Sequence, residues 1–117
     1  MKLRALGVAT TLAATAFLSI ATGTAAEAAP GCGSKPAANG SRTATVDGPY
    51  QTYNLYKGPA TSCGTTGATV KDGTGATALC AANITGTTWY YMDTPSGKGW
   101  ISSANVKTYS GAPGNCA

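Results

Sequence analysis

The sequence holds few side chains that could catalyse a reaction. It contains no histidine, and the only carboxylates after residue 28 are Asp47, Asp72 and Asp93. Nucleophilic catalysis by serine or cysteine commonly needs a neighbouring base such as histidine. Asp47 and Asp72 each precede a glycine in turn-like sequence, where aspartate is common for conformational reasons. We therefore expect no hydrolase built on paired carboxylates or on an activated nucleophile, and predict that the protein is not an enzyme.

The four cysteines, Cys32, Cys63, Cys80 and Cys116, are the second set of reactive side chains. They are too far apart in sequence for a redox-active Cys-x-x-Cys motif. Export, which the first 28 residues predict as described below, makes two disulfides the expected state of four cysteines; small domains use them where hydrophobic burial is insufficient. Three pairings are possible, and the sequence does not choose among them. With the cysteines assigned to disulfides, we predict no zinc site and no other cofactor.

Aromatic side chains are the feature best suited to binding a ligand. Trp89 and Tyr91 alternate along one strand-like segment, and Tyr56 ends another, so we predict that the three share an exposed face. Asn54 adds an amide that could hydrogen-bond a peptide or a sugar. The predicted ligand-binding residues are therefore Asn54, Tyr56, Trp89 and Tyr91. The alternative is that the rings cover a core that is short of aliphatic residues.

The first 28 residues have the pattern of a secretory signal peptide. Lys2 and Arg4 precede an uncharged stretch of apolar and small residues, and Ala26-Glu27-Ala28 fits the motif that signal peptidase cleaves. We expect cleavage after Ala28, with Thr24-Ala25-Ala26 as a second possible site. The stretch is short and rich in Ala and Thr, which disfavours a stable membrane anchor. The predicted location is extracellular or associated with the cell wall.

Residues 29–117 carry six basic and three acidic side chains, and the basic ones are spread singly along the chain. This distribution predicts ordinary solubility with some attraction to anionic polymers, and no nucleic-acid binding. Only seven Val, Ile or Leu residues are present, so the core is expected to be thin and to rely on Tyr and Trp. Residues 29–42 are rich in turn formers and are predicted to be a segment tethered by Cys32. Residues 43–117 are predicted to form one domain with a C-terminal tail, as a monomer.

Short strands separated by Gly or Pro turns are expected throughout this domain. A long loop from Ala60 to Gly75 is expected to contain one brief strand near Gly67–Val70. Tyr53 and Leu55 should point to one face of their strand, opposite Asn54 and Tyr56. The other expected strands are Arg42–Val46, Tyr50–Tyr56, Thr74–Ala82, Thr87–Asp93 and Gly99–Ser102. Together they predict an all-β fold, either a small barrel or a sandwich.

Four segments, taken in order, resemble the bacterial SH3-type domain, a small β-barrel of exported and cell-wall proteins. The resemblance covers about residues 43–106. Its segments are Tyr53-Asn54-Leu55-Tyr56-Lys57-Gly58-Pro59, Lys71-Asp72-Gly73 with Thr74–Cys80, Trp89-Tyr90-Tyr91-Met92, and Gly97-Lys98-Gly99-Trp100-Ile101-Ser102-Ser103.

The resemblance implies an SH3-like β-barrel of about five to six short strands, held by two disulfides. It favours pairing Cys80 with Cys116, because exported relatives often join the central strand to the C-terminal region, and this leaves Cys32 with Cys63. It also implies a non-enzymatic module that binds cell-wall peptidoglycan through its peptide or cross-bridge. One departure concerns the ligand groove, because Asn105 stands where the family commonly has an aromatic residue.

Two other functions fit the same composition. The protein could be a small secreted inhibitor of an extracellular hydrolase, with Tyr50 or the loop Ala60 to Gly67 as the inhibitory element. It could also be an extracellular structural protein without a specific ligand.

Overall fold

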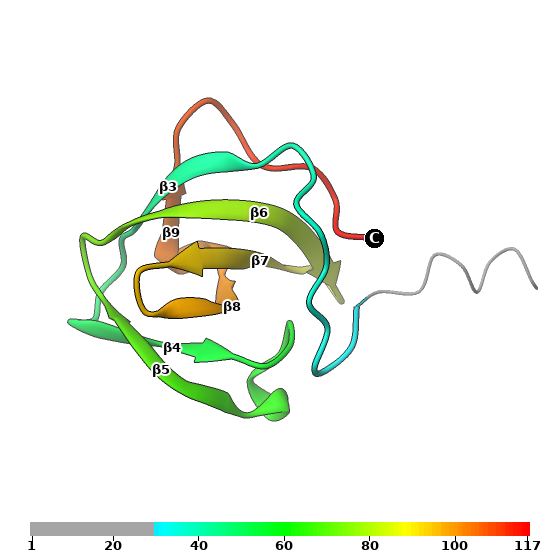
Figure 1. Ribbon diagram of the computed structural model, residues 1–117, viewed down its shortest axis with the longest axis horizontal. Coiled ribbons are helices and arrows are strands. Elements are labelled where there is room, and N and C mark those ends of the chain that lie inside the picture. Colours follow the sequence, from blue (N-terminus) through cyan, green and yellow to red (C-terminus); the bar gives the residue numbers. More distant parts are fainter. Residues whose placement is uncertain (1–29) are drawn as a thin grey trace, which may run out of the picture.

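Seven short strands and two single-turn 3₁₀ helices form in residues 30–117, the part of the chain that the computed structural model describes (Figure 1). The predicted signal peptide lies outside the described residues. The strands are β3 (Arg42–Val46), β4 (Thr52–Tyr56), β5 (Thr65–Lys71), β6 (Gly75–Ile84), β7 (Thr87–Thr94), β8 (Gly97–Ser102) and β9 (Val106–Thr108). The 3₁₀ helices are η3 (Thr61–Cys63) and η4 (Ser103–Asn105).

All seven strands belong to one curled antiparallel sheet, in the order β5-β4-β8-β7-β6-β3-β9. The prediction of an all-β fold is confirmed. The strand count is seven instead of five to six, and no ladder joins the edge strands β5 and β9 within residues 30–117. The extra edge strand β9 was missed because three residues are too few to show a pattern. It pairs with β3, and Val46 lies opposite Val106.

Strand β5 is longer than the brief strand expected within a loop. It pairs with β4 from Thr65 to Lys71, across a shift of register between Asn54 and Tyr56. Gly67 has a φ of 93°, which glycine adopts without the steric cost that a Cβ would bring. Because of the glycine and the shift of register, residues 65–71 do not show the regular alternation of polar and apolar residues that marks a strand, and their sequence resembles a loop.

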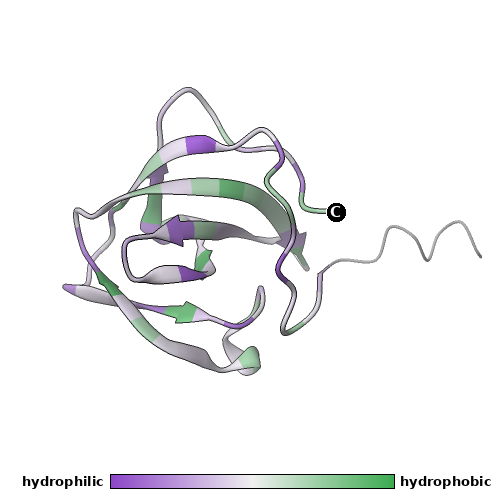
Figure 2. Cartoon of the chain, in the orientation of Figure 1, coloured by the Kyte–Doolittle hydropathy of each residue, from purple (hydrophilic) through white to green (hydrophobic). Residues whose placement is uncertain are grey.

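Both faces of the sheet carry buried apolar side chains. The inner face holds Val46, Leu55, Tyr90, Met92 and Ile101, with small alanines between them. Figure 2 shows few strongly hydrophobic residues on the strands, as the thin core predicted from composition requires. The outer face holds a second cluster, which we call the outer cluster: Cys80, Ala82, Trp89, Tyr91 and Trp100. Because successive strand residues point to opposite faces, neighbours such as Trp100 and Ile101 enter different clusters.

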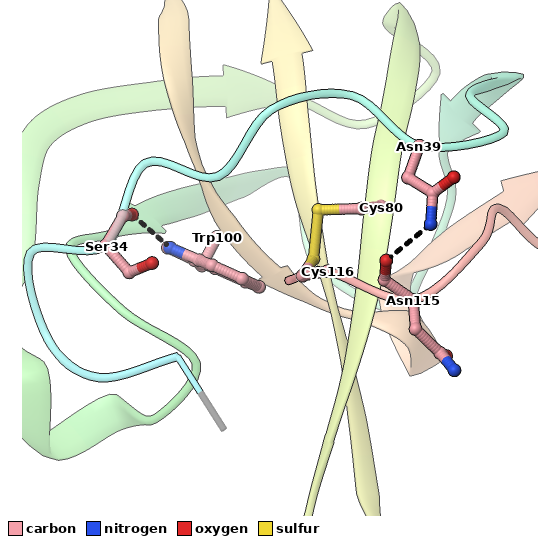
Figure 3. The surroundings of a disulfide bond; sticks show 6 residues. All are labelled: Ser34, Asn39, Cys80, Trp100, Asn115 and Cys116. Atoms are coloured by element: carbon pink, nitrogen blue, oxygen red, sulfur yellow. Dashed lines mark hydrogen bonds between the residues drawn. A yellow bond between two sulfur atoms is a disulfide. The ribbon is translucent and has the colours of Figure 1, made fainter. Parts of the chain in front are cut away.

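The two ends of the described chain lie over the outer cluster, side by side. Asn39 donates its backbone N–H to the Leu79 carbonyl of β6 at 2.8 Å, and its own carbonyl accepts from Gly114 at 2.9 Å. The Asn39 side chain donates to the Asn115 carbonyl at 2.7 Å (Figure 3). Cys116 then donates to the Ala81 carbonyl at 2.8 Å. The N-terminal segment and the C-terminal tail thus cover the face that β6, β7 and β8 would otherwise expose.

Two disulfides hold these ends, and both expected pairings are confirmed. Cys80 on β6 is bonded to Cys116 in the tail. Cys32 in the N-terminal segment is bonded to Cys63 in η3. Beside the second bridge, Gly33 donates its backbone N–H to the Lys57 carbonyl at 2.6 Å. The N-terminal segment is therefore fixed to the end of β4 as well as to β6.

Gly99→Ala is expected to lower the free energy of unfolding by about 1–3 kcal/mol, as overpacking of a core does. A Cβ at this position would lie 2.6 Å from the Leu55 Cβ and 3.3 Å from the Tyr56 carbonyl oxygen. Urea denaturation measures the change. Gly75→Ala is the matched control, because a Cβ there has no neighbour within 4 Å. Equal denaturation midpoints for the two variants would contradict this prediction and show that β4 and β8 can move apart at this contact at little cost in stability.

Candidate functional site

The outer face of β4, β8 and β7 brings the predicted site residues together. Antiparallel pairing places Tyr56 opposite Trp100, Trp100 opposite Tyr91, and Ser102 opposite Trp89. Alternation along β4 directs Asn54 and Tyr56 to one face and Tyr53 and Leu55 to the other, as predicted. The face of Tyr53 and Leu55 is the buried, inner one.

A cavity of about 540 Å³ lies at one end of this face, where the inner-side residue Tyr53 also reaches it. We call it the tyrosine groove and define it by Tyr50, Tyr53, Asn54, Tyr56, Trp89 and Asn105. Among the described residues that line it, none carries a formal charge. Its walls are aromatic rings, and its polar groups include the side-chain amides of Asn54 and Asn105. Such a surface suits an extended, largely uncharged chain whose backbone can hydrogen-bond the amides.

The predicted exposed strip of aromatic residues is wrong for two of its three members. Trp89 is 8% exposed and Tyr91 is 4% exposed, whereas Tyr56 is half-buried. The two rings belong to the outer cluster, and Tyr56 packs edge-on against Trp89 with 5.6 Å between ring centroids. The structure therefore places Asn54, Tyr56 and Trp89 around the tyrosine groove. It places Tyr91 outside the groove, in a second cavity.

Tyr50 and Tyr53 complete the groove, although neither was predicted as a ligand-binding residue. The Tyr53 hydroxyl accepts a hydrogen bond from the Tyr50 backbone N–H at 2.9 Å. It lies 3.0 Å from the Tyr50 carbonyl and 3.2 Å from Asp72 Oδ1, and its proton can be donated to either acceptor. The Tyr50 ring is 65% exposed and lies edge-on to Tyr53. Sequence could have indicated this pair only through the preceding Asp47-Gly48-Pro49 turn.

Two tyrosine hydroxyls have raised pKa values. Burial raises the pKa of Tyr53, and the nearby Asp72 carboxylate raises it further. Burial also raises the pKa of Tyr91, with a second contribution from Asp93. In both cases the anion is disfavoured because it would lose hydration and lie near an existing negative charge.

Ultraviolet titration of the six tyrosines is expected to show a late fraction, ionising above the ordinary pKa of about 10. Since the folded-state pKa is raised, Tyr53 and Tyr91 contribute stability that is present below about pH 10 and is lost as the pH rises through the folded value. Tyr53→Phe and Tyr91→Phe should each remove part of the late fraction. A single transition for all tyrosines would contradict the assignment.

The second cavity, of about 410 Å³, lies at the other end of the same face. We call it the lysine pocket and define it by Tyr56, Tyr91 and Trp100 with Lys35, Lys57 and Lys98. The three lysines come from the N-terminal segment, the end of β4 and the start of β8. Because they are far apart in sequence, the even spread of basic residues gave no sign that they meet.

Within residues 30–117, no three His, Cys, Asp or Glu side chains gather in a way that could hold a metal ion. No helix in this described region is long and apolar enough to cross a membrane. A search of family models, curated proteins and solved structures finds no match to the chain.

Proposed function

We propose that this protein is a secreted, non-enzymatic binding module whose tyrosine groove holds a cell-wall peptide, with peptidoglycan as the ligand. The proposal rests on the groove itself, where aromatic walls and two amide side chains meet and no residue from the described range that lines it is charged. A planar aromatic wall loses water readily against an extended peptide, and amides pair with its backbone. The sequence resemblance to the SH3-type domain supports the ligand class and an SH3-like description of the curled sheet. The two disulfides are consistent with an extracellular location.

Retention of the purified protein on purified peptidoglycan tests this proposal. Tyr50→Ala and Asn54→Ala should each weaken retention, because truncating a central contact commonly costs about 2 kcal/mol or more. Both side chains are exposed, so these variants should keep the melting temperature of the parent. Tyr109→Ala is the control, since its ring is exposed but lies outside the groove. Wild-type retention by the Tyr50→Ala, Asn54→Ala double variant would overturn the proposal.

A substitution at Asn105 tests the same proposal by an expected increase in retention. Asn105 is half-buried and lines the groove at the position where the resembled family commonly has an aromatic residue. Asn105→Tyr should enlarge the aromatic wall and tighten retention. Unchanged or weaker retention by a normally folded variant would show that the groove does not act in the manner of that family.

A second candidate is a secreted hydrolase inhibitor, favoured by the rigid display of Tyr50. Its ring is 65% exposed, while its backbone is held on both sides by the Tyr53 hydroxyl. A fixed, protruding aromatic residue can enter the pocket of an enzyme at little entropic cost. A panel of extracellular proteases and amylases tests this alternative. Inhibition that Tyr50→Ala abolishes would support it, and no inhibition across the panel would count against it.

A further inference from the structure

The lysine pocket has a rigid frame around an aromatic floor. Trp100 forms part of this floor and donates its indole N–H to the Ser34 carbonyl at 3.1 Å (Figure 3). The disulfide Cys32–Cys63 and the hydrogen bond from Gly33 to Lys57 hold the same segment against β4. The backbones that carry Lys35 and Lys57 are thus fixed relative to Lys98 on β8. The cavity is framed by covalent and hydrogen-bonded contacts between distant segments.

The charge around this pocket favours an anion. Lys35, Lys57 and Lys98 are exposed at its rim, and no acidic residue from the described range, 30–117, lines it. Asp93 lies opposite Lys98 in the β7–β8 register and offsets part of that charge, which leaves an excess of positive charge. A carboxylate placed among several ammonium groups gains charge-assisted hydrogen bonds. The half-buried Tyr56 ring, which also lines this pocket, can contact the apolar atoms that carry the anion.

The lysine pocket and the tyrosine groove lie on one line along the strands and share Tyr56. On β8, outward-facing residues run from Ser102 in the groove, through Trp100, to Lys98 in the pocket. The four-residue step from Lys98 to Ser102 corresponds to about 13 Å along the strand, which is the length of about four residues of an extended ligand. One extended peptide can therefore occupy both cavities by passing over Tyr56.

The two ends of this line differ in charge, which would fix the direction of such a peptide. Asp72 contacts Tyr53 at the groove end, whereas the lysines surround the other end. We propose that the lysine pocket binds a carboxylate at the end of an extended peptide whose preceding residues lie in the tyrosine groove. This inference rests on the proposed function, since it supplies the chemistry and orientation of the same ligand.

The two tryptophans of the chain provide one nuclear magnetic resonance signal for each cavity. Trp89 lines the groove and Trp100 lines the pocket, so their indole N–H resonances report the two places separately. The probe is N-acetylated penta-alanine, in three forms with a free carboxylate, with a carboxamide, or with a final glutamate and a carboxamide. The free acid should shift both resonances, and the carboxamide should bind at least about tenfold more weakly. If the glutamate form binds as tightly as the free acid, the carboxylate that the pocket binds belongs to a side chain. If it binds as weakly as the carboxamide, the pocket binds the C-terminal carboxylate.

Charge-matched variants complete the test. The Lys57→Gln, Lys98→Gln double variant should weaken binding of the free acid about tenfold and reduce its salt dependence. The Lys71→Gln, Lys107→Gln double variant removes the same charge outside both cavities and should bind as the parent does. Equal affinity for acid and carboxamide, with the Trp89 resonance shifting, would overturn this inference and leave the proposed function intact. Failure of the Trp89 resonance to shift would count against the groove itself, and a shift of Trp100 alone would overturn the continuous site.

Discussion

Reduction of both disulfides is expected to unfold the domain at room temperature. The bridges close loops with sequence separations of 31 and 36 residues. In the chain-entropy model each loop is worth roughly 4 kcal/mol, so the two together contribute an amount within the roughly 5–15 kcal/mol of total stability that is typical of folded proteins. The core cannot replace this contribution, because many of its positions hold alanine. Circular dichroism before and after reduction, without denaturant, measures the result.

The two bridges should differ when removed separately. The Cys80→Ala, Cys116→Ala variant should lose more stability than the Cys32→Ala, Cys63→Ala variant. Cys80 is fully buried in the outer cluster, and its bridge holds the tail that covers this cluster. Alanine avoids leaving an unpaired hydroxyl at the buried position. A reduced protein with an unchanged near-ultraviolet spectrum would contradict the first expectation, and equal losses would contradict the second.

Alternation and turn residues were sufficient to locate most strands of this sheet. The expected strand Arg42–Val46 matches β3 at both ends, and Pro95 and Ser96 form the turn between β7 and β8, in keeping with the expected Gly or Pro turns. Tyr53 and Leu55 share one face of β4, here the buried one, and the shared face was predicted because the period of two is fixed by strand geometry. These features depend on residues close together in sequence. These strands, turns and faces could therefore be predicted without knowledge of the rest of the chain.

The burial of the outer face could not be predicted from local sequence. Alternation correctly places Trp89 and Tyr91 on one side of β7, but it does not say whether another segment covers that side. The cover comes from residues near 34–39 and 114–116, which have no apolar period of their own. The lysine pocket escaped prediction in the same way, since its charges meet only after the N-terminal segment is bonded to β4 and to Trp100.

Trp100→Ala is expected to lower the free energy of unfolding by about 3–5 kcal/mol, the usual cost of truncating a buried tryptophan. Trp100 is 0% exposed, and its ring lies 5.1 Å from that of Tyr91 between the sheet and the N-terminal segment. The truncation would leave a cavity and remove the hydrogen bond to Ser34, so the segment would also lose its contact with β8. Urea denaturation of the oxidised protein measures the loss.

Trp100→Phe separates the packing of this ring from its hydrogen bond. It keeps an aromatic ring but lacks the indole N–H, so it should lose less stability than Trp100→Ala. The hydrogen bond alone is worth about 1 kcal/mol. Tyr109→Ala, at an exposed ring outside both clusters, should cost much less than either change. If Trp100→Ala were as stable as Tyr109→Ala, the N-terminal segment would not be packed against the sheet through Trp100. The lysine pocket would then lack the fixed wall on which its proposed affinity for a carboxylate depends.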